Sequence, residues 1–159
     1  MTVLVVEDDE NKRNQLRQFL RETFPEMGVD LERSLQGGLR RIRRSRPELV
    51  LLDMTLPNYD PGPDEPGGQT HIFGGQEFLR QMDRFEIVLP VIVVTQFETF
   101  GKPPNTKLLQ DLDRELRAEH ATSYRGAVYY HSAIHGWKEE LKELMRLTLA
   151  DGRRGDLGA

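Results

Sequence analysis

Apolar residues follow two different periods along the chain. Short continuous apolar runs are typical of strands buried on both faces. Between them lie longer stretches in which apolar residues recur every three or four positions, as on one face of a helix. The runs predict five strands, at residues 3–6, 29–33, 49–52, 90–94 and 126–131. The longer stretches predict five helices, at residues 11–24, after Ser34, at 76–85, after Asn105 or Thr106, and at 137–149.

The order of these elements predicts the fold class. Strands that alternate with helices form a parallel sheet with helices on both faces, so we expect an α/β protein with a doubly wound five-stranded parallel sheet. Residues 1–150 form a single domain in this prediction. Residues 58–75, rich in Pro and Gly, are expected to be an insertion after the third strand. Residues 151–159 carry almost no core residues and are expected to form a flexible C-terminal tail.

Composition and charge narrow the range of functions. The chain has 159 residues, a formal net charge of -4 and no cysteine, which excludes disulfides and thiolate metal sites. Because no apolar run reaches roughly 18 residues, no membrane span is expected. Because no basic leader precedes the first strand, a cytoplasmic protein is expected. The arginine-rich segment 33–46 also carries Leu39 and Ile42, which indicates a solvated helix face rather than a nucleic-acid surface.

Polar side chains directly follow three of the predicted strands. Glu7 and Asp8 come after the first strand, Asp53 after the third and Thr95 after the fourth. The carboxyl ends of parallel strands meet at one edge of the sheet, so acids from neighbouring strands would converge there. Carboxylates held so close repel one another unless a cation joins them, and hard oxygen ligands with room for water favour Mg²⁺. A carboxylate beside such a cation can act as a nucleophile toward phosphorus.

Three segments, VLVVEDDENKR, PELVLLDMTLP and PVIVVTQF, resemble the receiver domain of two-component response regulators. The resemblance covers nearly the whole chain and implies a flavodoxin- or CheY-like sheet with strand order 2-1-3-4-5. The site that it implies consists of the phosphoacceptor Asp53, the switch hydroxyl Thr95, and a Mg²⁺ held by Glu7, Asp8, Asp53 and the backbone carbonyl of Thr55.

The resemblance also implies a function. A receiver of this kind accepts a phosphoryl group on Asp53 from a sensor histidine kinase or a phosphotransfer protein, in phosphorelay signal transduction. Output is then expected through contact with another protein, which the sequence does not identify. The expected chemistry is at most self-phosphorylation and autodephosphorylation, not that of an independent enzyme. Whether the protein forms a homodimer is left open.

The fifth strand departs from the family pattern. The segment GAVYY resembles the start of that strand and makes Tyr130 the switch aromatic. Counting from Tyr130, the lysine and proline usual in the family are replaced by Ala133 and Ile134. The missing charge favours an alternative, a degenerate receiver that acts as a phosphorylation-independent protein-interaction module. Three acids in one crevice favour phosphorylation instead. Residues 58–75 and 97–120 are also longer than in relatives.

An enzyme of similar strand–helix order is a third interpretation. Phosphatases of the haloacid dehalogenase type place a second aspartate two residues after the first, and that position holds Thr55. Nucleases of the Toprim type need a paired-aspartate motif where only Asp53 stands. Both kinds of enzyme therefore fit the sequence poorly.

Overall fold

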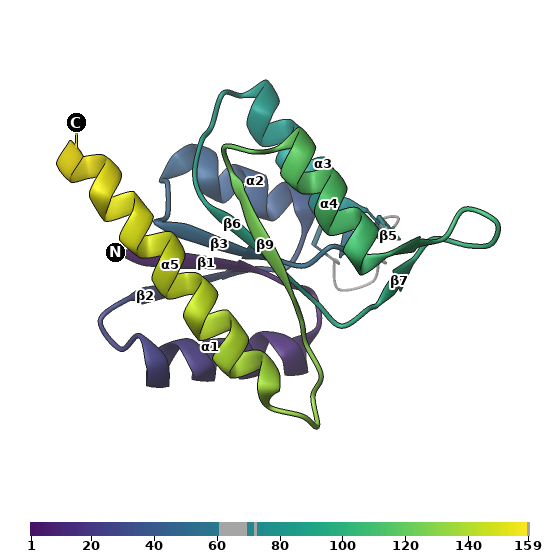
Figure 1. The fold of residues 1–159 in the computed structure, drawn as a ribbon, viewed down its shortest axis with the longest axis horizontal. Coiled ribbons are helices and arrows are strands. Elements are labelled where there is room, and N and C mark those ends of the chain that lie inside the picture. Colours follow the sequence, from purple (N-terminus) through teal and green to yellow (C-terminus); the bar gives the residue numbers. More distant parts are fainter. Residues whose placement is uncertain (61–69, 72, 159) are drawn as a thin grey trace.

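The centre of the molecule is a five-stranded parallel sheet (Figure 1). The structure is a computed structural model and describes residues 1–60, 70–71 and 73–158. Its strand order is β2-β1-β3-β6-β9. Counted along the chain within this sheet, the order is the expected 2-1-3-4-5, and the predicted fold class is confirmed. The strands are β1 (Thr2–Val6), β2 (Gly28–Glu32), β3 (Leu49–Leu52), β6 (Val91–Thr95) and β9 (Tyr124–Tyr129).

Helices cover both faces of the sheet and create two cores (Figure 1). Strand β1 illustrates the division, because Val3 and Val5 pack on one face while Leu4 and Val6 pack on the other. Strands buried on both sides have no polar face, which explains the continuous apolar runs in the sequence. One face carries α1 (Glu10–Thr23) and α5 (Gly136–Gly158), and the other carries α2 (Leu35–Arg44), α3 (Gly74–Arg84) and α4 (Leu109–Glu119).

Side-chain caps define where the first two helices begin. The Asp9 carboxylate accepts a hydrogen bond from the Lys12 backbone N–H at 2.8 Å. The predicted helix start after Ser34 is confirmed, since the Ser34 hydroxyl caps α2 by accepting a hydrogen bond from the Gly37 N–H at 3.0 Å. At the other end of the chain, α5 continues through residues 151–158, where the sequence predicted a tail. Once a helix is nucleated, each further residue adds one backbone hydrogen bond, so a helix can continue past the last apolar residue of its stripe.

Two short antiparallel strands lie at the borders of the predicted insertion. Residues 61–69 and 72, which form most of that segment, lie outside the described part of the chain. Strand β4 (Leu56–Pro57) pairs with β5 (Thr70–His71), so the two ends of the segment are held together. The last two residues of the predicted insertion, Gly74 and Gly75, instead begin α3.

The region before α4 is a β-hairpin. The predicted helix start at Asn105 or Thr106 is wrong, because β7 (Thr99–Phe100) pairs antiparallel with β8 (Lys107–Leu108) and α4 begins only at Leu109. The error came from Leu108, which has helical spacing to Leu112 but is 52% exposed in the hairpin. Spacing alone does not distinguish an exposed hairpin leucine from the first residue of a buried helical stripe.

Strand β9 contains a register shift against β6. Val91 pairs with Tyr124 but Ile92 pairs with Gly126, so one extra residue, Arg125, is inserted into β9. Gly126 adopts a φ of +146° at this point, a conformation that other residues rarely take. A bulge of this kind reverses which face each following side chain occupies.

Gly75 lies where α3 meets the segment after β3, and we expect it to tolerate no side chain. A Cβ added there would lie 2.8 Å from the Asp53 carbonyl oxygen and 3.0 Å from the Met54 Cα. Because these are backbone atoms, Gly75→Ala should lower the free energy of unfolding by about 1–3 kcal/mol in urea denaturation.

Gly136→Ala is the matched control for this substitution. A Cβ at Gly136 meets no atom within 4 Å, so its stability should stay within about 0.5 kcal/mol of the wild type. Equal stability of the two variants would show that α3 can move away from Asp53 at no cost.

Candidate functional site: an acidic crevice at the sheet edge

The parallel register brings three of the predicted acids together. Val6 of β1 pairs with Leu52 of β3, so Glu7 and Asp53 follow on the same rung of neighbouring strands. The backbone N–H of Asp53 continues this pairing by donating to the Val6 carbonyl at 3.0 Å. Carboxylate oxygens of Glu7, Asp8 and Asp53 all lie within 4.8 Å of one another. The acids that the sequence placed at two separate strand ends therefore form one cluster.

The three carboxylates differ in burial. Glu7 is 1% exposed and Asp53 is 4% exposed, whereas Asp8 lies at the surface and forms the mouth of the crevice. Burial raises the pKa of Glu7 to about 8, and the nearby Lys12 ammonium only partly opposes this rise. Burial likewise raises the pKa of Asp53, again against the effect of Lys12. Because charged carboxylates are costly here, the crevice favours a further cation.

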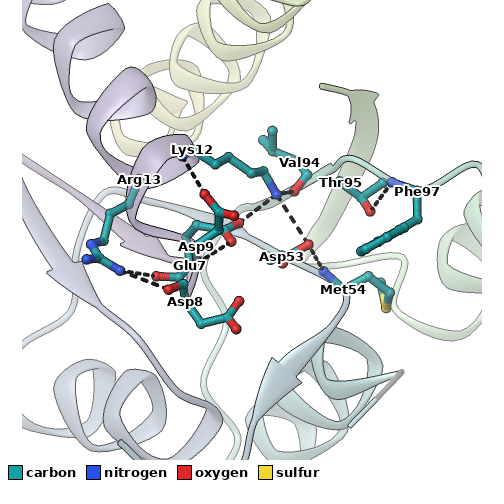
Figure 2. A network of polar contacts seen from close by, with 10 residues as sticks. All are labelled: Glu7, Asp8, Asp9, Lys12, Arg13, Asp53, Met54, Val94, Thr95 and Phe97. Atoms are coloured by element: carbon teal, nitrogen blue, oxygen red, sulfur yellow. Dashed lines mark hydrogen bonds and ion pairs between the residues drawn. The ribbon is translucent and has the colours of Figure 1, made fainter. Parts of the chain in front are cut away.

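A buried lysine completes the cluster (Figure 2). The Lys12 ammonium lies 2.6 Å from Glu7 Oε2 and 3.3 Å from Asp53 Oδ1. It also donates a hydrogen bond to the carbonyl oxygen of Val94 at 2.7 Å. An ammonium group has three protons, so each can be directed at the carboxyl end of a different strand, β1, β3 or β6. Lys12 is 1% exposed.

Lys12 was not predicted from the sequence, although the chain carries a signal for it. Residues 12, 16 and 19 lie on one face of a helix, and Leu16 and Phe19 pack in the core beneath α1. A lysine therefore stands at the first position of a buried apolar stripe. A buried lysine is almost always paired, and acids precede it within one helical turn in the segment EDDENK.

Hydrogen bonds between backbone groups and side chains hold the acidic segments in place. The Arg13 guanidinium donates to the carbonyl oxygens of Glu7 at 3.1 Å and of Asp8 at 3.3 Å, which braces the turn between β1 and α1. The Met54 N–H donates to Asp53 Oδ1 at 2.8 Å. Charge-assisted hydrogen bonds of this kind orient a carboxylate before any ligand arrives. Thr55 follows two residues after Asp53, and a role for its carbonyl as a metal ligand stays a prediction.

Thr95 and Tyr129 are neighbours at the end of β6 and β9. Thr95 is fully buried, and its hydroxyl oxygen accepts a hydrogen bond from the Phe97 N–H at 3.2 Å. Thr95 pairs with Tyr129 across the two strands. Tyr129 and Ala127 line a cavity of about 430 Å³ beside α4. Tyr129 is therefore the tyrosine that lies beside Thr95, the predicted switch hydroxyl, and on the face of the sheet that α4 covers.

Tyr130, the predicted switch aromatic, lies on the opposite face of the sheet. Its ring centroid is 5.0 Å from that of Trp137 in the core under α1 and α5. Its hydroxyl donates to Gln15 Oε1 on α1 at 2.8 Å. Tyr130 therefore does not lie on the α4 side of the sheet. The extra residue in β9 exchanges the faces on which the following side chains lie.

The cluster fits a small, hard divalent cation. Its donors are all carboxylate oxygens, which such cations prefer, and their mutual distances are short enough for one ion to contact all three residues. Lys12 contacts two of the residues from the buried side, while the exposed Asp8 leaves room for water at the mouth. An acid at a strand end, a cation and an open mouth are the parts that phosphoryl transfer to a carboxylate requires.

Comparison with known proteins assigns the family. The sequence profile of the response regulator receiver domain matches residues 3–103, which include β1, the acidic crevice and the end of β6. The chain belongs to the response regulator receiver domain family. The predicted resemblance is thereby confirmed, and the C-terminal part of this receiver domain extends beyond the matched residues.

Relatives and solved structures agree with this assignment. An uncharacterized protein, y4jR of Sinorhizobium fredii, is 38% identical over 151 residues, or 94% of this chain and 99% of that one. The Detocs response regulatory protein DtcB of Enterobacter cloacae is 30% identical over 143 residues, 89% of this chain and 95% of that one. A CheY-like receiver domain protein of Methanospirillum hungatei shares the fold, with a TM-score of 0.61, 20% identity and 97% of each chain covered. Within the described residues, no helix is both long and apolar enough to span a membrane.

The loop after β9 lacks the cation that the family pattern places there. Ala133 is exposed, and its N–H donates to His131 Nδ1 at 3.2 Å. Residues 130–136 contain neither lysine nor arginine. The next lysine, Lys138, lies on α5, with its ammonium 5.7 Å from the ring centroid of Trp137. The positive charge in this receiver's crevice comes from α1 instead.

Mg²⁺ binding should depend on Asp8 more than on its neighbour Asp9. Asp8→Asn removes one of three clustered carboxylates and should weaken binding about tenfold or more, since ligand charge sets the affinity of oxygen sites. Trp137, the only tryptophan in the chain, packs on Tyr130, whose ring lies 5.8 Å from the Lys12 ammonium. Its fluorescence during a Mg²⁺ titration measures the affinity, and calorimetry checks it independently.

Asp9→Asn is the control, since it removes the same charge one residue away. Asparagine caps a helix as well as aspartate does, so α1 stays intact, and affinity should change by no more than about twofold because an exposed charge is screened by water and salt. Equal losses in both variants would mean that the crevice attracts cations only through its overall negative charge.

Proposed function

We propose that this receiver domain accepts a phosphoryl group on Asp53 from a sensor histidine kinase or a phosphotransfer protein and signals by contact with another protein. The observation that carries the proposal is the convergence of Glu7, Asp8 and Asp53 within 4.8 Å at the carboxyl edge of the sheet. The resemblance to a protein named as a response regulatory protein adds support.

The proposed reaction is a displacement at phosphorus. An Asp53 carboxylate oxygen forms the new bond to phosphorus while the bond from phosphorus to the donor breaks, and the donor atom leaves with the electron pair. The product is an acyl phosphate on Asp53. The proposed chemistry of the domain is limited to gaining this group from a phosphodonor and losing it to water.

Glu7, Asp8 and Asp53 are the residues that would hold Mg²⁺, with the Thr55 carbonyl as a further ligand. When bound, Mg²⁺ supplies positive charge that offsets the charge of the phosphoryl oxygens. The Thr95 hydroxyl is proposed to bind one of these oxygens. Its hydroxyl oxygen accepts from the Phe97 N–H, but its own proton stays available as a donor.

Output is proposed to pass from Thr95 to the surface formed by α4, β9 and α5. Thr95 and Tyr129 are paired on adjacent strands, and Tyr129 borders the cavity of about 430 Å³ with Leu109 and Asp113 of α4. A shift of the Thr95 hydroxyl toward a phosphoryl group would change the packing beside Tyr129, and that cavity gives its ring room to move. Tyr129 therefore replaces Tyr130 as the proposed switch aromatic.

A degenerate receiver that signals without phosphorylation is the second candidate. The absence of any lysine or arginine at residues 130–136 favours it. The buried contact between Lys12 and Asp53 opposes it, since the crevice still contains a cation beside the acceptor.

Incubation with acetyl phosphate and Mg²⁺ separates the two candidates. We expect intact-protein mass spectrometry to show one added phosphoryl group on the wild type, with acetate released as the phosphorus–oxygen bond to it breaks. Asp53→Asn should show none, because an amide oxygen is a far weaker nucleophile than a carboxylate.

The matched control is again Asp9→Asn, which leaves the crevice acids unchanged and should be labelled at close to the wild-type rate. If the wild type stays unlabelled under conditions that label an ordinary receiver, the degenerate alternative is correct. If Asp53→Asn is labelled as fast as the wild type, the acceptor is another residue.

A further inference from the structure

We propose that Lys12, on α1, is the residue that contacts the phosphoryl oxygens on Asp53, a role for which the loop after β9 has no cation. This inference rests on the proposed function and adds a positioning and binding residue to it. Among the described residues, Lys12 is the cation that forms an ion pair with Asp53. Residues 130–136, where the family pattern has its lysine, contain neither lysine nor arginine.

The lengths of the three Lys12 contacts differ in a way that suits this role. The contacts to Glu7 Oε2 and to the Val94 carbonyl are short, at 2.6 and 2.7 Å, and anchor the ammonium group. The contact to Asp53 Oδ1 is longer, at 3.3 Å, beyond the usual length of a charge-assisted hydrogen bond. The third proton is therefore the least engaged, and it faces the carboxylate on which the phosphoryl group would be placed.

The direction of approach leaves the mouth of the crevice open. Lys12 reaches Glu7 and Asp53 from α1, and in Figure 2 its ammonium lies on one side of this pair while the Asp8 carboxylate lies on the other. Asp8 is exposed, whereas Lys12 is buried. A phosphodonor and a divalent cation can therefore enter past Asp8 without displacing the lysine.

The burial of Lys12 is hard to explain by packing alone. A methionine or leucine at position 12 would extend the apolar stripe of Leu16 and Phe19 without the desolvation cost of a buried ammonium. With lysine there, three carboxylates and one cation share the crevice. The formal charge is -2 instead of -3, which lowers the repulsion that an incoming phosphate dianion meets.

In the proposed reaction Lys12 keeps its proton. As the Asp53 oxygen bonds to phosphorus, the ammonium donates a hydrogen bond to a phosphoryl oxygen, where negative charge is concentrated. The leaving group takes the electron pair of the broken bond, and no proton passes through Lys12. Its contribution is to the binding and orientation of charge, so it should affect the rate at saturating donor more than the binding of Mg²⁺.

The test compares Lys12→Met with the wild type and with Arg21→Met, which removes a positive charge from an exposed position of the same helix. Each folded variant is assayed for Mg²⁺ affinity by Trp137 fluorescence and for Asp53 labelling by acetyl phosphate at saturating Mg²⁺. We expect Lys12→Met to bind Mg²⁺ at least as tightly as the wild type, because a neighbouring positive charge is gone. Its labelling rate at saturating acetyl phosphate should fall about tenfold or more.

Arg21→Met should match the wild type in both assays. Wild-type labelling in Lys12→Met would show that Lys12 is structural only and would overturn the inference while leaving the proposed function intact. Faster labelling would also overturn it, because Lys12 would then be blocking the acceptor. An unlabelled wild type would overturn the inference and the proposed function together.

A measurement on the wild type covers the case in which Lys12→Met does not fold. Beryllofluoride, a phosphoryl mimic, is added with Mg²⁺ to protein that carries ¹⁵N in its lysine side chains. We expect the ammonium resonance of Lys12, identified by its loss in Lys12→Arg, to shift while that of the exposed Lys102 does not. An unchanged Lys12 resonance in protein that has bound the mimic would overturn the inference.

Discussion

One buried ammonium group holds the functional end of this protein together. Lys12 contacts a carboxylate after β1, a carboxylate after β3 and a backbone carbonyl at the end of β6. A buried charge is tolerated only when its partners are close and well oriented, so these three strand ends are constrained together. The same contacts place Asp53 beside a cation and raise the cost of separating α1 from the sheet.

In this crevice the positive charge beside Asp53 comes from Lys12 on α1, and not from the loop after β9 where the family pattern has a lysine. Electrostatic stabilisation depends on where a charge lies, not on which element carries it. The family pattern places a lysine in the loop after the last strand, whereas this chain has one on the first helix. Helix α1 can supply this charge because it begins at Glu10, directly after the acidic segment of residues 7–9.

The two tyrosines of β9 illustrate how a single extra residue changes a functional assignment. Motif spacing pointed to Tyr130, but the insertion of Arg125 into the ladder places Tyr130 under α1 and α5 and Tyr129 beside Thr95. A side chain in a strand alternates with period two, so one bulged residue exchanges the two faces. Neither the bulge nor the β7–β8 hairpin has a local pattern strong enough to be predicted from one sequence.

Local sequence patterns were enough to predict the α/β fold and the positions of Glu7, Asp8, Asp53 and Thr95 at strand ends, and the family resemblance predicted the strand order. These follow from local periodicity and from the rule that parallel strands share one functional edge. Two features became visible only in the folded chain: Lys12 contacts Asp53, 41 residues away in the sequence, and Tyr129 rather than Tyr130 faces α4. Such contacts depend on strand register and on the packing of α1 across the sheet, and neither is encoded in the residues next to the site.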